Sequence, residues 1–153
     1  MVITRKNLSG TLSGVAGEYF VAAELSRRGY IASVTLRNSK GVDILCSNAE
    51  ASRTVGIQVK TNQGRGAEWV LNKKIEDYFA DNLFYIFVSL NDNRSPPDYF
   101  VVPSKTVAEF AKTYHQEWLT TPGRKGRVHK DNPMRKFRDD KKIYLSRWEL
   151  LNL

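Results

Sequence analysis

The sequence contains a single cysteine, Cys46, among its 153 residues, and it contains no low-complexity block. A lone cysteine cannot form a disulfide within the chain, which is typical of proteins from reducing compartments. We therefore expect a cytoplasmic protein. Because 41% of the residues are hydrophobic, the composition also excludes a collagen-like, mucin-like or wholly disordered chain.

Long hydrophobic runs are absent as well. The longest apolar run, residues 83–88, has six residues, whereas a membrane-spanning helix needs about 20. No apolar stretch follows Arg5 and Lys6, so we expect no secretory signal. No cysteine pair lies near His115 or His129, so a zinc site is not expected. The sequence therefore predicts neither a membrane segment nor a zinc centre.

Acidic residues are fewer than basic ones, and the imbalance is local. The chain has 24 Lys and Arg against 16 Asp and Glu, and residues 121–153 alone hold 10 basic and 4 acidic side chains. Such a segment can bind a polyanion such as DNA, although a solvated, solubilising tail explains the charge equally well. The cations that could follow a duplex backbone are Arg124, Lys125, Arg127, Lys130, Arg135, Lys136 and Arg138.

Local patterns predict a single α/β domain over residues 1–153, with a basic C-terminal extension at 121–153. Ser13 can cap a helix that runs to about Arg28, where Gly29 would end it. Alternating apolar residues predict strands at 32–36, 42–46 and 54–61, and a polar turn at 37–41. Further strands are expected at 69–71, 83–90 and 99–102, then a helix from about residue 104, a long basic loop at 122–143 and a docking element at 144–153. This order indicates an α/β sandwich around one mixed sheet.

Four polar residues interrupt these patterns. Glu18 falls on the apolar face of the first predicted helix, and Asp43 lies at the start of the second strand. Gln58 and Lys60 share one face of the third strand. If the second and third strands form a hairpin, these groups converge at one edge of the sheet. Two carboxylates and an amide oxygen suit Mg²⁺, and a lysine beside such an ion can orient a water that attacks a phosphodiester.

At these positions the sequence resembles the PD-(D/E)XK nuclease superfamily. The resemblance rests on Gly17-Glu18, Gly41-Val42-Asp43 and Gln58-Val59-Lys60, and it covers roughly residues 10–115. Members include restriction endonucleases, archaeal Holliday-junction resolvases, Mrr-like enzymes and some intron homing endonucleases. The resemblance implies a restriction-endonuclease-like α/β/α sandwich, with a central mixed sheet flanked by helices.

The resemblance also implies the roles of the site residues. Asp43, the side chain of Gln58 and the backbone carbonyl of Val59 would bind Mg²⁺ or Mn²⁺. Glu18 would complete or orient the site, and Lys60 would position the attacking water. Two positions depart from the family pattern: Val42 stands where a proline is expected, and Gln58 stands where an acidic residue is expected. Gln58 resembles the Mrr-like and some homing-endonuclease branches, but it removes one negative charge.

Three functional hypotheses follow. The first is a metal-dependent endodeoxyribonuclease acting on DNA, with a homodimer as the arrangement that many family members use. The second is a catalytically degenerate nucleic-acid-binding or partner-binding protein of the same fold. The third is a globular protein whose basic tail serves a protein or ribosomal partner. Each of the four polar residues, taken alone, is also explained by an ordinary surface, turn or strand position.

Overall fold

The computed structural model describes residues 7–36 and 40–153. Arg5, Lys6 and residues 37–39 of the predicted turn lie outside the described residues. The α-helices of the described part are α1 (Gly10–Arg27) and α2 (Ser104–Thr120). Its strands are β1 (Ile31–Val34), β2 (Ile44–Ser47), β3 (Thr54–Asn62), β4 (Glu68–Asn72), β5 (Leu83–Ser89), β6 (Asp98–Pro103) and β7 (Met134–Arg138). Short 3₁₀ helices are η1 (Lys73–Asp77), η2 (Asn91–Asn93), η3 (Arg124–Gly126) and η4 (Trp148–Leu151). Within the described ranges, no helix is long and apolar enough to cross a membrane.

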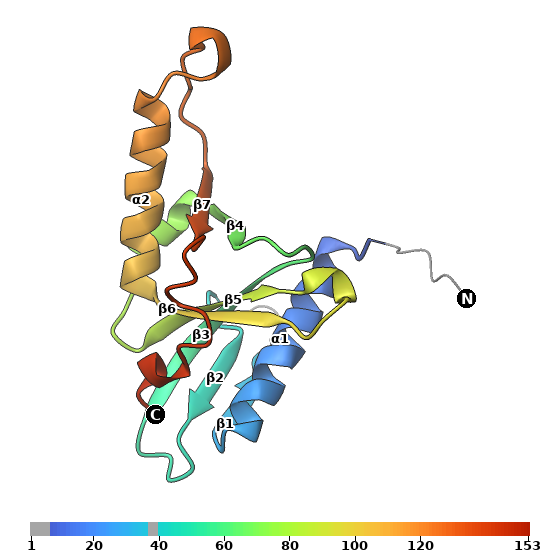
Figure 1. The fold of residues 1–153 in the computed structure, drawn as a ribbon. Coiled ribbons are helices and arrows are strands. Elements are labelled where there is room, and N and C mark those ends of the chain that lie inside the picture. Colours follow the sequence, from blue (N-terminus) through green and yellow to red (C-terminus); the bar gives the residue numbers. More distant parts are fainter. Residues whose placement is uncertain (1–6, 37–39) are drawn as a thin grey trace, which may run out of the picture.

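A five-stranded mixed sheet forms the middle layer of the fold. Its strand order is β1-β2-β3-β5-β6, and the β3–β5 pair is parallel while the other neighbouring pairs are antiparallel. The two α-helices lie on opposite faces of this sheet (Figure 1). Along β5, Ile86 and Val88 pack in the core with α1, whereas Tyr85 and Phe87 pack in the core with α2. The predicted α/β/α sandwich is therefore confirmed.

Helix α1 begins earlier than the sequence predicts. Ser9 is its N-cap and accepts a hydrogen bond from the Leu12 N–H, whereas Ser13 is buried inside the helix. The buried residues of α1 include Ser13 and Gly17, and a Cβ at Gly17 would lie 1.9 Å from Thr61 Oγ1. The contact with β3 thus uses small residues that a hydrophobic pattern does not reveal. Glu18, predicted on the apolar face, is half-buried beside that contact.

The segment predicted as a loop at 122–143 contains strand β7. This strand pairs with β4 in a separate two-stranded sheet, which packs on α2 and which the sequence did not predict beside the central mixed sheet. Phe137 of β7 stacks on Phe87 with ring centroids 4.5 Å apart, and Arg135 is buried against Glu76. Charged neighbours hid this strand in the sequence. The docking of the chain end is confirmed, because Trp148 and Leu151 are buried in the core.

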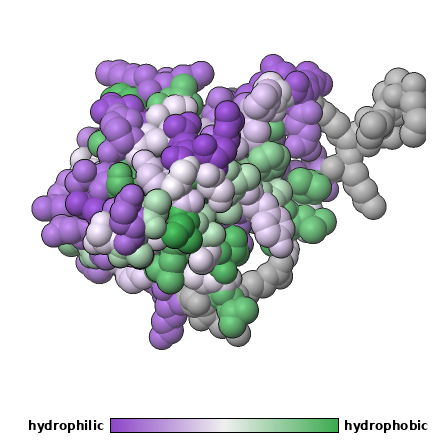
Figure 2. Space-filling model, turned by 90° about the horizontal axis from the view of Figure 1, so that it is seen from below, coloured by the Kyte–Doolittle hydropathy of each residue, from purple (hydrophilic) through white to green (hydrophobic). Residues whose placement is uncertain are grey.

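The α2 face of the central sheet is covered unevenly. Helix α2 packs mainly on η1, β5, β6 and β7, and it leaves Ile31 on β1 and Leu45 on β2 exposed. Seen from below, exposed hydrophobic side chains form groups among hydrophilic ones (Figure 2). The neighbouring polar face of β3 is consequently accessible, and this is where two of the predicted site residues lie.

Candidate active site

Gln58 and Lys60 lie on the α2 side of β3. Ile57 and Val59 pack into the core below α1, so the alternation of side chains along the strand directs Gln58 and Lys60 to the opposite face. Both side chains are half-buried. They line a cavity of about 610 Å³, together with the residues Lys40, Gly41, Asn72, Lys74, Ile75, Asp77, Tyr78 and Tyr85. We call this space the β3 cavity.

Asp43 is held against the edge of β3 by two hydrogen bonds. Its backbone N–H donates to the carbonyl oxygen of Ile57 at 2.8 Å, and its Oδ2 accepts from the N–H of Val59 at 2.7 Å. The ladder between β2 and β3 ends at Ile44–Ile57, so the carboxylate occupies the place of the next backbone partner. The structure therefore brings Asp43 beside the strand segment that carries Gln58 and Lys60.

The backbone of Val59 presents its polar groups to the same edge. The N–H and C=O of one residue in an antiparallel ladder point towards the same neighbouring strand. Because the Val59 N–H meets Asp43, its carbonyl also lies on the Asp43 side. The predicted donor set of Asp43, Gln58 and the Val59 carbonyl is therefore gathered at one place, although its role remains a prediction.

Glu18 approaches this place from the other side. Glu18 and Asp43 line a second, shallow hollow, together with Thr35 and residues of the first turns of α1. Neither Glu18 nor Asp43 lines the β3 cavity. Asp43 meets the strand that carries Gln58 and Lys60 through the hydrogen bond from the Val59 N–H. The approach of α1 that places Glu18 depends on the close packing of Gly17 against Thr61.

The turn beside the cavity is held by Tyr78, a residue that sequence reasoning missed. Gly41 has φ +69°, and a Cβ at this position would lie 2.5 Å from the Tyr78 ring. The Tyr78 hydroxyl donates to the carbonyl oxygen of Lys40 at 3.2 Å. Glycine is therefore required here both by the backbone conformation and by the aromatic ring. Nothing in the sequence linked residue 78 to residues 40–41.

The β3 cavity is basic, and its floor contains a buried phenol. Lys40, Lys60 and Lys74 line it against one acidic residue, Asp77. Tyr85 is fully buried, and within the described ranges its hydroxyl has no hydrogen-bond partner. Burial raises the pKa of Tyr85 to about 12, and Tyr78 and Asp43 act in the same direction. A tyrosine inside an apolar strand is the signal that could have revealed this residue.

The seven cations predicted to bind nucleic acid fall into two groups. The exposed ones, Arg124, Lys125, Arg127 and Lys130, lie in the segment that follows α2, which projects away from the sheet (Figure 1). The other three are on β7 and are ion-paired. Arg135 is 3% exposed and pairs with Glu76, while Lys136 and Arg138 pair with Glu68 at 2.7 and 3.3 Å. We call residues 114–138 the arm.

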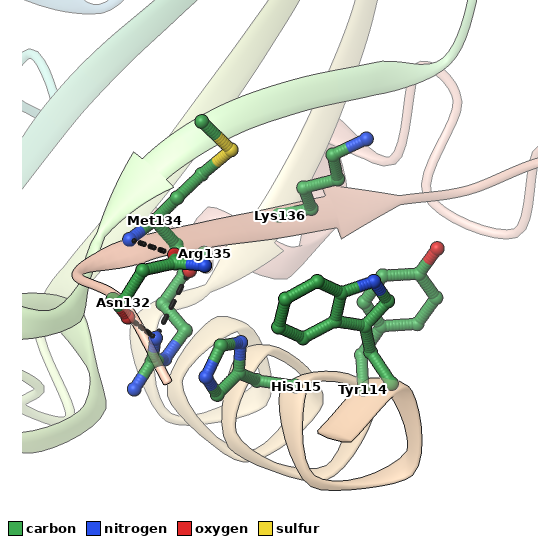
Figure 3. Close-up of a pocket in the computed structure, with 7 residues that line it drawn as sticks. Tyr114, His115, Asn132, Met134, Arg135 and Lys136 are labelled. Atoms are coloured by element: carbon green, nitrogen blue, oxygen red, sulfur yellow. Dashed lines mark hydrogen bonds between the residues drawn. The ribbon is translucent and has the colours of Figure 1, made fainter. Parts of the chain in front are cut away.

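A pocket at the base of the arm explains how the arm is anchored. It lies between α2 and β7 and is lined by Tyr114, His115, Trp118, Asn132, Met134, Arg135 and Lys136 (Figure 3). His115 Nε2 and Asp131 Oδ1 are 2.8 Å apart, and Arg135 donates to the carbonyl oxygen of Asn132 at 2.6 Å. The rings of Trp118 and His129 lie 4.1 Å apart. His115, Arg135 and Lys136 of this pocket each have an acidic partner, which holds α2 and β7 together at the base of the arm.

The candidate donors suit a hard divalent cation. Among the described residues, no three His, Cys, Asp or Glu side chains form a group that could hold a metal. Mg²⁺, however, is bound by few protein ligands, commonly one or two carboxylates with several waters. A carboxylate oxygen of Asp43, already fixed by the Val59 N–H, together with an amide oxygen and a carbonyl oxygen, satisfies this chemistry. The residues present therefore fit Mg²⁺ or Mn²⁺.

Two solved structures resemble this chain in fold. One is Hjc, a Holliday junction resolvase from the archaeal hyperthermophile Archaeoglobus fulgidus, with a TM-score of 0.51, 12% identity, and 89% of this chain and 92% of that chain covered. The other is the bacterial homing endonuclease I-Ssp6803I, with a TM-score of 0.54, 14% identity, and 94% of this chain and 91% of that chain covered. No family model and no curated protein matches the sequence. Both neighbours are nucleases, and at these identities the likeness concerns the fold alone.

Proposed function

We propose that this protein is a metal-dependent endonuclease that hydrolyses phosphodiester bonds in DNA, with its active site where Asp43 meets β3. The observation that carries the proposal is the hydrogen bond from the Val59 N–H to Asp43 Oδ2 at 2.7 Å. This bond holds a carboxylate beside Gln58 and Lys60 on a fold shared with a Holliday junction resolvase and a homing endonuclease.

The proposal assigns each residue a task. Asp43, the Gln58 amide oxygen and the Val59 carbonyl would hold Mg²⁺ or Mn²⁺, with Glu18 completing the site from α1. The bound ion would offset the charge that develops on the phosphodiester during hydrolysis. Lys60 would orient the attacking water through its ammonium group. Lys40 and Lys74, which line the β3 cavity, would attract the phosphates on either side of the cleaved bond.

The arm supplies the DNA contacts at a distance from the cavity. Arg124, Lys125, Arg127 and Lys130 are exposed, so their charges are available to phosphates. Contacts of this kind position a duplex and carry no sequence information. Arg135, Lys136 and Arg138 would act mainly by holding β7 in place through their acidic partners. A homodimer would bring two such cavities to the two strands of a duplex.

A second candidate function is nucleic-acid binding without catalysis. The observation that favours it is Gln58, because an amide attracts a metal ion less than a carboxylate does. This reading predicts tight, salt-sensitive DNA binding and no hydrolysis. The two functions therefore differ in one measurable respect, metal-dependent cleavage that requires Lys60.

The test is cleavage of supercoiled and branched DNA with Mg²⁺ or Mn²⁺, comparing the native protein with Lys60→Ala. We expect metal-dependent nicking that falls about 100-fold or more in Lys60→Ala, the scale of a lost acid–base group, while DNA binding persists. Lys112→Ala is the matched control, since Lys112 is an exposed lysine on α2. Cleavage that persists in Lys60→Ala would contradict the assigned site, and binding without cleavage would favour the second function.

A further inference from the structure

A glutamine in a metal site faces a problem that a carboxylate does not. A carboxylate presents two equivalent oxygens, whereas an amide presents one acceptor oxygen and one NH₂ group with two donors. If Gln58 is to contribute a metal ligand, its Oε1 must face the ion and its Nε2 must be directed elsewhere. A site of this kind therefore needs a hydrogen-bond acceptor next to the glutamine.

Tyr85 occupies the position next to Gln58. The two residues are register partners on the parallel strands β3 and β5, so both side chains lie on the same face of the sheet. Both line the β3 cavity. Tyr85 is fully buried, and within the described part of the chain its hydroxyl has no hydrogen-bond partner.

The buried hydroxyl of Tyr85 lowers the stability of the fold. An unpartnered buried hydroxyl costs free energy, and phenylalanine would fill the same space without that cost, as its neighbours Phe84 and Phe87 do. A phenol carries its proton at neutral pH. A protonated phenol can accept one hydrogen bond and donate another.

Three other polar groups in or next to the cavity have partners of their own. The Tyr78 hydroxyl donates to the Lys40 carbonyl oxygen, and Asn72 Oδ1 accepts from the Lys74 N–H at 3.1 Å. Asp43 Oδ2 accepts from the Val59 N–H. The phenol oxygen of Tyr85 is thus the buried acceptor that stands beside Gln58 with its capacity unused in the described structure.

We propose that Tyr85 is a positioning residue that fixes the orientation of the Gln58 amide. Its oxygen accepts a hydrogen bond from Gln58 Nε2 when metal binds, and Oε1 is thereby turned towards the ion. This inference rests on the proposed function, because it takes Gln58 to be a metal ligand. It also explains how a site with glutamine in place of an acidic residue retains a defined ligand geometry.

The test is a double-mutant cycle read by Mn²⁺ affinity in the absence of DNA. The variants are Tyr85→Phe, Gln58→Glu and the two together, and isothermal titration gives the dissociation constant of each. We expect Tyr85→Phe alone to weaken Mn²⁺ binding about tenfold, the lower end of the losses seen when a group behind a metal ligand is removed. In the Gln58→Glu background, Tyr85→Phe should leave the Mn²⁺ affinity unchanged, because either oxygen of a carboxylate can face the ion.

The matched control is Tyr99→Phe. Tyr99 is a buried tyrosine in the core on the opposite face, and its replacement should leave Mn²⁺ affinity unchanged. Equal losses from Tyr85→Phe in both backgrounds would indicate a merely structural role and overturn the inference. An unchanged affinity in Tyr85→Phe would overturn it as well.

The outcomes also separate this inference from the proposed function. Mn²⁺ binding that couples Tyr85 to Gln58 without any DNA cleavage would support the positioning role and contradict the nuclease proposal. DNA cleavage with no coupling between the two residues would do the reverse. If Gln58→Ala binds Mn²⁺ as tightly as the native protein, Gln58 is not a ligand, and the positioning role fails with that assignment.

Discussion

The arm and the β3 cavity both contain several basic side chains, but these side chains differ in whether they have acidic partners. At the base of the arm, Arg135 and His115 are buried and each has an acidic partner, Glu76 and Asp131. In the cavity, three lysines face one aspartate, and a buried phenol lacks a partner among the described residues. Buried polar side chains that have partners hold a helix or strand in place. Polar side chains that lie together without partners indicate a candidate ligand-binding surface. The difference predicts which substitutions unfold the protein and which leave it folded but inactive.

The largest effect on stability is expected at Arg135. Replacement by methionine leaves Glu76 half-buried without its cation, so we expect a loss of about 3–5 kcal/mol in the free energy of unfolding. Urea denaturation measures this loss. Lys60→Met, in the cavity, should change the same free energy by less than about 0.5 kcal/mol. If both variants lost a similar free energy of unfolding, the proposed difference between the arm and the β3 cavity would be contradicted.

The next effect is expected in DNA affinity. Replacing Arg124, Lys125, Arg127 and Lys130 by glutamine should weaken binding about 100-fold near physiological salt, and should reduce the salt slope of log Kd by about 3. Stability should be unchanged, because these side chains are exposed. The matched control replaces four exposed basic residues elsewhere in the chain, Arg27, Arg53, Arg94 and Lys112. An unchanged salt slope would remove the tip of the arm from the DNA interface.

Much of the fold was predictable because its strands follow simple alternation. The apolar strand at 83–90 and the neighbours of Gln58 and Lys60 were recognisable from hydropathy alone. Strand β7 was not, because Arg135 is buried only by virtue of Glu76, which lies 59 residues earlier in the chain. The start of α1 was also missed, since its contact with β3 relies on Ser13 and Gly17, and neither is hydrophobic.

The positions of the candidate site residues were predictable from the sequence, but the residues that pack around them were not. Asp43, Gln58 and Lys60 were readable because polar residues interrupt strand patterns. Their convergence depends on the β2–β3 register, which the hairpin assumption anticipated. Tyr78 and Tyr85 were missed because their relation to the site arises from tertiary packing and from strand pairing between segments separated in sequence.

A smaller effect is expected where α1 meets β3. A Cβ at Gly17 would lie 1.9 Å from Thr61 Oγ1, so Gly17→Ala should destabilise the protein by about 1–2 kcal/mol despite the better helix propensity of alanine. Adding Thr61→Ala should recover most of this loss, because it removes the clashing hydroxyl. Gly14→Ala is the control, since its Cβ would meet nothing within 4 Å, and it should stabilise by up to about 1 kcal/mol. Thermal and urea unfolding of these variants test whether the packing of α1 on β3 depends on this close contact.

The smallest effect concerns pH and returns to the base of the arm. The hydrogen bond from His115 holds the pKa of Asp131 below its ordinary value of 3.8. A carboxyl whose folded pKa is depressed contributes stability above its unfolded pKa, and that contribution is lost as pH falls through the folded value. Asp131→Asn should therefore be less stable than the native protein at pH 7, and the gap should narrow once the pH drops below about 4. Urea midpoints at the two pH values measure the gap.

Because Asp131 is exposed, solvent screening keeps the effect small. A gap that stays constant with pH would show that the charge of Asp131 adds nothing to the anchoring of the arm, which would then rest on Arg135 and the ring contact between Trp118 and His129.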